Sequence, residues 1–357
     1  MARFPGAPRR KPFLSRFRLD PLISHTFDNA QHKGEKRPVS GVLLLDKPPH
    51  ISSNQALQGA KRLFLARKAG HTGTLDPMAT GLLAICLGEA TKFSSELLGA
   101  DKCYEAALML GYSSTTGDAE GEISVARDGQ QRDVGDMHFE PGRIESVLKS
   151  FTGAIMQTPP MYSAIKVQGK PLYAYAREGV ELPRKPREIH IHDLRMLGLA
   201  RNEMRIFVKC SSGTYIRTLG EDIGVALGCG GAYLAALRRV ALGDFDISQS
   251  HALGDLGEMT LSQRDACLLP ADRLLHRYFA AVLADGSVEA LLHGRKIREI
   301  EAGLYRTNEG KDACLADFSN LEEGQRLRLY DGRNCFLGLG EVTPEMEIAP
   351  LRLVTGW

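Results

Sequence analysis

The sequence predicts an α+β protein in which a mixed sheet with flanking helices is followed by a smaller β domain. Apolar and polar residues alternate over 204–210, which is typical of a half-buried strand. Apolar residues recur with the helical period over 53–64, 140–153 and 216–227. From 277 to 357, short strand-like segments are separated by glycine turns, as in small β-barrels and sandwiches. The length of 357 residues fits about two domains.

The first 40 residues are predicted to form a basic, flexible tail. Residues 1–37 hold nine Lys/Arg and three Asp/Glu, a formal charge of +6, whereas the rest of the chain carries −4. Prolines and scattered charges show no amphipathic period there, so we expect no packed element. No continuous apolar segment follows the basic start, and we therefore expect no secretory signal. Any surface that binds nucleic acid must be a local one.

The folded part is expected to begin with a strand over 42–45 and a helix whose N-cap residue is Ser52 or Ser53. The segment over 70–81, GHTGTLDPMATG, follows and places His71 and Asp76 among turn residues. Its glycines permit a left-handed backbone, and Pro77 restricts the residue before it. Local chemistry alone leaves both a plain turn and a catalytic loop open.

Further elements are predicted along the chain. Apolar runs indicate strands over 82–87 and 104–110, and a loop over 111–121 follows the second. Residues 154–190 contain several Pro and Gly and five Lys/Arg between Lys166 and Lys185, so we expect irregular backbone there.

Composition excludes several classes of site. The chain is 43% hydrophobic and 25% charged, and no apolar run approaches the ~18 residues of a membrane span. Seven cysteines without a Cys-x-x-Cys pair argue against a disulfide framework or a zinc site. We expect reduced thiols in a cytoplasmic protein. No Walker loop, metal-ligand cluster or dinucleotide fingerprint is present, so no metal and no cofactor is expected.

The segment Gly-His-x-Gly-x-Leu-Asp-Pro-x-Ala-x-Gly over 70–81 resembles the catalytic motif of the TruB-type RNA pseudouridine synthases. Other segments resemble further motifs of that family in the family's order. These are GVLLLDKP over 41–48, KCY over 102–104, TPPMYSAIK over 158–166, GTYIR over 213–217 and LRR over 237–239. The resemblance therefore covers most of the chain.

The resemblance implies a fold and its domains. It implies a pseudouridine synthase fold over 41–272, with a mixed, mainly antiparallel sheet flanked by helices and loops. A flap at about 154–190 would clamp the RNA. The segment over 277–357, by its position and by Leu292-His293-Gly294, resembles the small β-barrel PUA-type RNA-binding module of this family.

The resemblance also assigns roles at the site. Asp76 matches the essential catalytic carboxylate, and Arg217 matches the arginine that pairs with it, where a planar guanidinium can grip a carboxylate through two hydrogen bonds. Tyr104 matches the tyrosine on which the base stacks. Tyr215 would lie against the base and help to remove a proton from its carbon, and Leu237 would supply an apolar wall. Spacing alone leaves Tyr104 as a core tyrosine and Arg217 as a solvated helix arginine.

The remaining predicted contacts concern binding. His71 matches a residue near the flipped base, and we expect a wedge and stacking role rather than a general base; a loop histidine bonded to backbone is the alternative. Phosphate contacts are expected from the basic residues Lys47, Lys102, Lys166, Lys170, Lys185 and Arg187.

The predicted function is conversion of the T-loop uridine of tRNA, position 55 in tRNA numbering, to pseudouridine. The predicted partner is the T arm of tRNA, and we expect a monomer with no membrane contact and no obligatory protein partner. One alternative is the RNA-guided, dyskerin-like branch, although the long flap and the PMYSAIKVQGKPLY segment over 160–173 favour the stand-alone bacterial branch. Another is a tRNA-folding factor without catalysis, which we would expect to lack Asp76 or Arg217.

Overall fold

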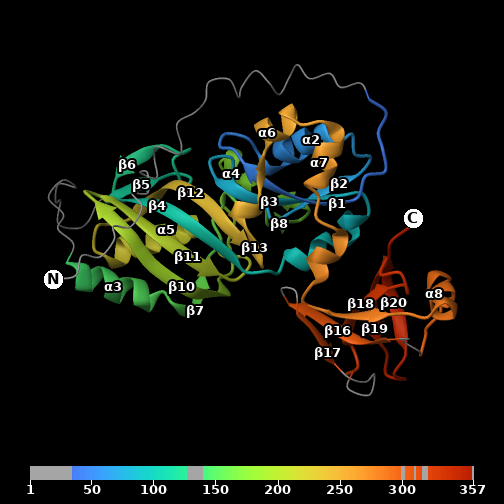
Figure 1. Ribbon diagram of the computed structural model, residues 1–357. Coiled ribbons are helices and arrows are strands. Elements are labelled where there is room, and N and C mark those ends of the chain that lie inside the picture. The colour runs from blue at the N-terminus through green and yellow to red at the C-terminus, as the bar shows by residue number, and fades with distance from the viewer. Residues whose placement is uncertain (1–33, 127–139, 299–301, 309–310, 316–320, 356–357) are drawn as a thin grey trace, which may run out of the picture. The chain divides into compact units, whose positions relative to one another are not determined.

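The computed structural model describes residues 34–126, 140–298, 302–308, 311–315 and 321–355 (Figure 1). Two larger sheets lie in these residues, one formed by segments between Gly41 and Ala252 and one by segments between Phe279 and Leu353. No helix among the described residues is both long and apolar enough to cross a membrane.

The first sheet contains ten strands among the described residues. They are β1 (Gly41–Lys47), β2 (Ala69–Thr72), β3 (Thr80–Leu87), β4 (Lys102–Leu110), β7 (Gly153–Gln157), β10 (Arg187–Ala200), β11 (Glu203–Cys210), β12 (Ala232–Leu242), β13 (Phe245–Asp246) and β14 (His251–Ala252). Their order is β14-β1-β3-β12-β4-β11-β10-β7, with β2 beside β3 and β13 beside β12. Only the pairs β1–β14 and β3–β12 are parallel among these described strands, so the predicted mixed, mainly antiparallel sheet is confirmed.

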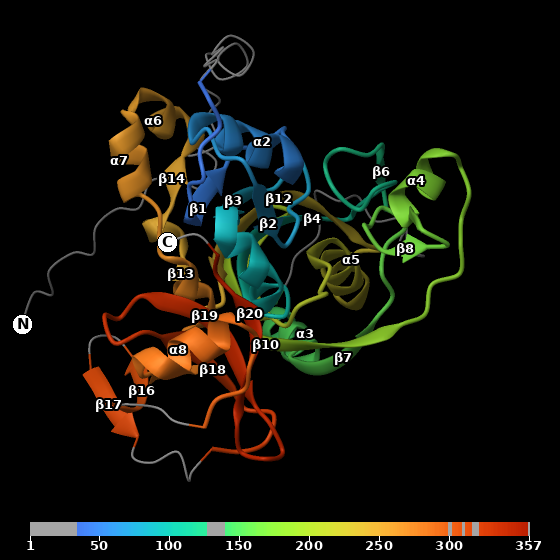
Figure 2. The ribbon, with the colours of Figure 1, turned by 90° about the vertical axis from the view of Figure 1, so that its right-hand side faces the viewer.

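Helices cover this sheet in two groups. Helix α2 (Ser53–Leu63) lies beside α6 (Leu253–Glu258) and α7 (Leu261–Ala266), as both ribbon views show (Figures 1 and 2). Its N-cap is Ser52, one of the two serines that the sequence offered, and the Ser52 hydroxyl accepts from the Gln55 N–H. Helices α3 (Pro141–Ser150) and α5 (Ile216–Ala226) pack on strands β10 and β12. Strand β4 presents Leu108 toward Gly220 of α5, so Tyr104 lies on the same face of the sheet.

The segment between β7 and β10 is partly regular. It contains the hairpin of β8 (Lys166–Val167) and β9 (Lys170–Pro171) and the short helix α4 (Leu172–Arg177). Irregular backbone was expected over 154–157 and 187–190, but these residues belong to β7 and β10. The two strands pair with each other from Gln157 opposite Arg187 to Gly153 opposite Ile191. That expectation was wrong at both ends because paired strands satisfy the backbone there. We call residues 158–186 the flap from here on.

The second sheet has six strands among the described residues, in the order β17-β16-β15-β18-β19-β20. They are β15 (Phe279–Val282), β16 (Ala302–Asn308), β17 (Lys311–Leu315), β18 (Arg326–Tyr330), β19 (Phe336–Val342) and β20 (Ile348–Leu353), with helix α8 (Asp285–Leu292) beside β20. Buried apolar side chains from β18, β19 and β20, including Leu327, Leu337 and Ile348, form its core. The predicted C-terminal β architecture is present, and the exact domain limits stay a prediction.

The predicted tail over 1–40 is too long at its C-terminal side. Residues 1–33 lie outside the described residues, but Arg37 is part of the fold. Its N–H donates to the Leu65 carbonyl at 2.8 Å, its Nε donates to the Phe64 carbonyl at 3.0 Å, and its guanidinium is paired with Asp265. Two adjacent backbone carbonyls and a carboxylate thus hold Arg37 in place.

Candidate active site

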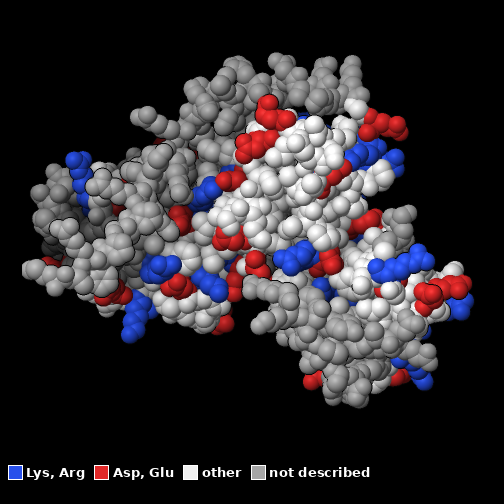
Figure 3. Space-filling view, in the orientation of Figure 1, with Lys and Arg blue, Asp and Glu red and all other residues white. Residues whose placement is uncertain are grey.

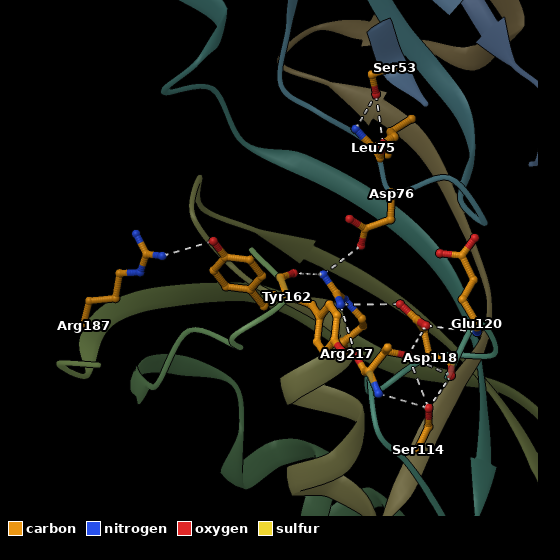
Figure 4. A network of polar contacts seen from close by, with 11 residues as sticks. Ser53, Leu75, Asp76, Ser114, Asp118, Glu120, Tyr162, Arg187 and Arg217 are labelled. Carbon is orange, nitrogen blue, oxygen red and sulfur yellow. Dashed lines mark hydrogen bonds and ion pairs between the residues drawn. The ribbon is translucent and has the colours of Figure 1, made fainter. Parts of the chain in front are cut away.

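The loop between β2 and β3 carries Asp76 and is held on both sides of that residue. Ser53, the first residue of α2, donates its hydroxyl to the Leu75 carbonyl at 2.9 Å and accepts from the Leu75 N–H at 2.8 Å (Figure 4). The His50 N–H donates to the Pro77 carbonyl at 2.8 Å. The direction of the Asp76 side chain is therefore set by bonds to its two neighbours.

Lys47, at the end of β1, contributes a third anchor. Its side chain is fully buried, and its Nζ donates to the carbonyls of Pro48 at 2.8 Å, Ile51 at 2.7 Å and Pro77 at 3.2 Å. Burial lowers the pKa of Lys47 to about 8, opposed by the nearby charge of Asp76. An enclosed ammonium with three carbonyl acceptors does not support the phosphate contact predicted for it.

Arg239 on β12 holds the beginning of the loop. Its guanidinium is buried and donates to the carbonyls of Leu82 at 2.7 Å and Gly73 at 3.0 Å. Gly73 has φ +74°, and a side chain at Gly81 would place its Cβ 2.3 Å from the Arg239 carbonyl oxygen. These two glycines of the motif are therefore needed for the turn and for the close approach of β3 and β12.

Arg217, the second residue of α5, links two carboxylates (Figure 4). Its Nη2 lies 3.1 Å from Asp76 Oδ2, and its Nη1 lies 3.4 Å from Asp118 Oδ2. The same nitrogens donate to the carbonyls of Thr116 at 3.0 Å and Tyr162 at 2.7 Å. The predicted pairing of Arg217 with Asp76 is present, but it is a single contact rather than a two-bond grip because the guanidinium is shared.

Asp118 was missed by the sequence reasoning. Its side chain is 3% exposed, and its Oδ1 accepts from the Thr116 hydroxyl at 2.6 Å and the Glu120 N–H at 3.1 Å. The segment TTGDAEG over 115–121 has the composition of an ordinary turn, which hid the residue. Its only local signal is a carboxylate in a glycine-bounded loop after a strand.

Burial and neighbouring charges together raise the pKa of Asp76 above the ordinary value of 3.8. Burial is the largest cause, and the negative charge of Asp118 acts in the same direction. Arg217 and, to a smaller extent, Lys47 oppose both effects. Two cations thus favour the ionised form of Asp76, against burial and the charge of Asp118.

A cavity of about 180 Å³ opens beside this carboxylate. The structure brings together there five predicted residues from distant segments, namely Asp76, Tyr104, Tyr215, Arg217 and Leu237. The Tyr104 side chain is buried, which raises the pKa of its hydroxyl. The cavity therefore combines one carboxylate, one guanidinium, aromatic rings and an apolar wall.

Tyr215 is held through its backbone and its hydroxyl. The side-chain amide of the buried Gln157 on β7 accepts from the Tyr215 N–H at 2.8 Å and donates to its carbonyl at 3.1 Å. Arg187 donates to the Tyr215 hydroxyl at 3.3 Å, and its guanidinium carbon lies 5.4 Å from the ring centroid. The position of Tyr215 therefore depends on Gln157, which the sequence did not single out.

Several predicted binding residues lie away from the cavity lining. His71 is on β2, and its buried Nδ1 has no hydrogen-bond partner among the described residues; burial and the charge of Arg239 lower its pKa. Lys102 is buried and donates to the carbonyls of Leu98 and Ala100, so it too is not available as a surface phosphate contact. Lys166 is exposed on β8 of the flap. No cluster of side chains suited to a metal ion is found in the part of the chain described.

Family models match nearly the whole length of the folded chain. Residues 61–216 match the TruB family pseudouridylate synthase N-terminal domain. Residues 217–276 match the tRNA pseudouridylate synthase B C-terminal domain, and residues 280–354 match the pseudouridine synthase II TruB C-terminal model.

Curated proteins and solved structures give two levels of similarity. The chain is 59% identical to tRNA pseudouridine synthase B of Nitrosospira multiformis over 90% of this chain and 97% of that protein. It is 51% identical to the protein of the same name from Nitrosomonas europaea, over 87% of this chain and 95% of that one. A Cbf5 chain in a Cbf5-Nop10-Gar1 complex has a similar fold, with a TM-score of 0.62 at 24% identity, covering 89% of this chain and 84% of that one.

Proposed function

Because this chain belongs to the TruB family of pseudouridylate synthases, we propose that it converts the T-loop uridine of tRNA, position 55, to pseudouridine. The observation that supports this most directly is the ion pair of Asp76 and Arg217 in a small cavity with Tyr104 and Leu237. Relatives with 44–59% identity are named tRNA pseudouridine synthase B.

The chemistry requires few groups. The bond from the sugar to N1 of uracil breaks, the base turns, and a bond to C5 forms while the C5 proton leaves and N1 gains one. No electron is lost or gained overall. Asp76 supplies the anion at the sugar or the base, and Arg217 stabilises that anion in surroundings that would otherwise favour its neutral form.

A uridine stacked in RNA cannot reach a carboxylate inside a cavity, so the nucleotide must flip out. The ring of Tyr104 would replace the lost stacking, worth roughly 1–3 kcal/mol. Leu237 closes the apolar side of the cavity, and Tyr215, held by Gln157 and Arg187, contributes a second ring. His71 is proposed to fill space in the RNA near the vacated position.

The flap is proposed to hold the T arm. It carries the exposed residues Lys166 and Lys185, which could meet phosphates, and its Tyr162 carbonyl accepts from Arg217 at 2.7 Å. On the face shown in Figure 3, acidic and basic side chains of the described residues are interspersed, which fits local rather than broad phosphate contacts. We propose that the protein acts as a monomer without a guide RNA or protein partner.

The RNA-guided alternative shares the fold. The Cbf5 chains resemble this one at 22–24% identity, whereas the tRNA pseudouridine synthase B proteins reach 59% over nearly their whole length. This difference favours a stand-alone tRNA enzyme. The folding-factor alternative needs no carboxylate, and the paired Asp76 and Arg217 argue against it.

Position-resolved pseudouridine mapping tests the proposal. Purified protein should modify a T-arm stem-loop at the single uridine with no added partner. Asp76→Asn should bind the same RNA within several-fold of wild type and form no pseudouridine. Activity of Asp76→Asn near wild type would remove Asp76 from the catalytic role, and strict dependence on a guide complex would favour the other branch.

A further inference from the structure

Ser163 on the flap has a buried hydroxyl that the described residues leave unbonded. The residue is 5% exposed, it lines the cavity beside Asp76, and its Oγ has no hydrogen-bond partner among the residues described. A buried polar group without a partner costs roughly 1–3 kcal/mol. An unbonded hydroxyl therefore lies at the wall of the space that the flipped nucleotide is proposed to occupy.

The backbone around Ser163 fixes the position of this hydroxyl. The Ser163 N–H donates to the Met161 carbonyl at 2.9 Å, and the Ser163 carbonyl accepts from the Tyr173 N–H at 3.1 Å. The carbonyl of the preceding Tyr162 accepts from Arg217 at 2.7 Å. The backbone that carries this hydroxyl is thus bonded, through the neighbouring Tyr162, to the arginine that pairs with Asp76.

Two other hydroxyls at the cavity have partners. The Thr214 hydroxyl donates to the Ser211 carbonyl at 3.0 Å, and the Tyr215 hydroxyl accepts from Arg187 at 3.3 Å. These bonds serve the protein itself. Ser163 differs because no described residue bonds its hydroxyl, so a group that enters the cavity can supply the bond.

We propose that the Ser163 hydroxyl donates a hydrogen bond to a carbonyl oxygen of the flipped uracil. The inference rests on the proposed function and adds a positioning contact to the same cavity. Uracil presents two carbonyl oxygens on either side of N3–H, whereas the ribose lies toward the bond that breaks. A donor fixed beside the cavity can therefore hold the base after that bond is broken.

The symmetry of the reaction makes one donor sufficient. When the detached base turns about the line from N3 to C6, N1 exchanges places with C5 and O2 exchanges places with O4. A hydroxyl that donates to one carbonyl of uridine would then meet the other carbonyl of pseudouridine. Ser163 can keep its bond in substrate and product without moving.

Substrate analogues test this contact. Single-turnover rates are measured for wild type and Ser163→Ala on T-arm stem-loops whose target base is uracil, 2-thiouracil or 4-thiouracil, because sulfur is a poor acceptor. The enzyme is in excess over RNA but below saturation, so that the rate also reports a contact already made in the bound substrate. Ser163→Ala should slow the uracil substrate by about 5–20-fold, the loss of one net hydrogen bond. The variant should lose much less on one of the two thio substrates, because the contact is already weakened there.

Controls separate this role from a structural one. Ser163→Ala should unfold at the same temperature as wild type or higher, because it removes an unbonded polar group. Thr214→Val, which changes a hydroxyl already bonded to the protein, should show the same ratio of rates on oxygen and sulfur substrates as wild type.

Several results would overturn the inference. If Ser163→Ala slows both thio substrates as much as it slows uracil, the hydroxyl does not contact a carbonyl oxygen. If instead Ser163→Ala weakens binding of a uridine substrate but not of a 2′-deoxyuridine substrate, the hydroxyl contacts the ribose. A wild-type rate for Ser163→Ala on uracil would remove the contact while leaving the proposed function intact. Failure of wild type to form any pseudouridine would instead reject the proposed function.

Discussion

Two effects raise the pKa of Asp76, and two neighbouring cations lower it. Burial and Asp118 raise the pKa above 3.8, and Arg217 with Lys47 lowers it. Since the raising effects dominate, the carboxylate takes up a proton at a higher pH than a free aspartate. We expect the single-turnover rate to fall on acidification through this raised pKa, measured with enzyme in saturating excess over T-arm RNA.

The variant Asp118→Asn checks the cause of that pH dependence. It removes a negative charge that faces Arg217 while an amide oxygen can still accept from the Thr116 hydroxyl. The acidic limb of the pH–rate profile, where the rate falls on acidification, should move to lower pH. The reason is that Asp118 no longer raises the pKa of Asp76. An unchanged acidic limb of the pH–rate profile would show that Asp118 does not influence Asp76.

Tyr104 should act through its ring. Tyr104→Phe keeps the aromatic face in the cavity, and Tyr104→Leu removes it. We expect single turnover to slow much more in the leucine variant, by about 10–100-fold, in line with roughly 1–3 kcal/mol of stacking. Equal losses in the two variants would indicate that the hydroxyl carries the role.

The sequence predicted the residues that line the cavity better than the residues that hold them in position. The five predicted residues that line the cavity lie in motifs whose chemistry is recognisable. Lys47 was misjudged, although it follows a continuous apolar run that signals a strand buried on both faces. Gln157 and Asp118 act through contacts between distant segments, which spacing does not reveal.

At the scale of elements, regular periodicity decided what was predictable. Strand β11 and helix α5 were predicted because their patterns are uninterrupted. Strands β10 and β12 were not, because bulges such as those at Ile191/Asp193 and Leu234/Ala236 break the alternation. The short α4 in the flap lacks enough turns for a helical pattern.

Lys47 joins the turn after β1 to the loop of Asp76, and its charge has a measurable consequence for stability. Burial lowers the pKa of folded Lys47 to about 8, whereas an unfolded lysine has its ordinary pKa of 10.5. Between these values the unfolded state binds more protons, so the contribution of Lys47 to the free energy of unfolding rises with pH.

Urea unfolding of wild type and Lys47→Met at several pH values measures this contribution. The variant should be less stable near neutral pH, because three carbonyls lose their donor. The difference in the free energy of unfolding should widen by on the order of 1–3 kcal/mol toward pH 10.5. Lys149→Met on the exposed side of α3 should show no such widening.

For the whole molecule, net positive charge is concentrated near the N-terminal end of the chain. Residues 1–33 hold seven Lys/Arg and two Asp/Glu, and they precede Arg37, which belongs to the fold. Neutralising Z phosphates lowers log affinity with log salt at a slope of about −0.7Z to −0.9Z. Deleting 1–33 should therefore weaken tRNA binding at low salt and flatten the slope, with the single-turnover rate on bound RNA nearly unchanged.

A full-length variant with the seven basic residues of 1–33 changed to glutamine separates charge from length. It should reproduce the deletion in both affinity and slope. If the deletion, the glutamine variant and wild type share one salt slope, the segment does not meet tRNA.

The loop of Asp76 is fastened by residues that enter the chain at very different times during synthesis. Lys47 and Ser53 precede it, but the Arg239 side chain that bonds Gly73 lies 166 positions later. A nascent chain on the ribosome cannot form the Arg239 bond to this loop until β12 has left the exit tunnel. Activity would then report completion of the sheet, and a prematurely released fragment would hold the motif without the power to modify tRNA.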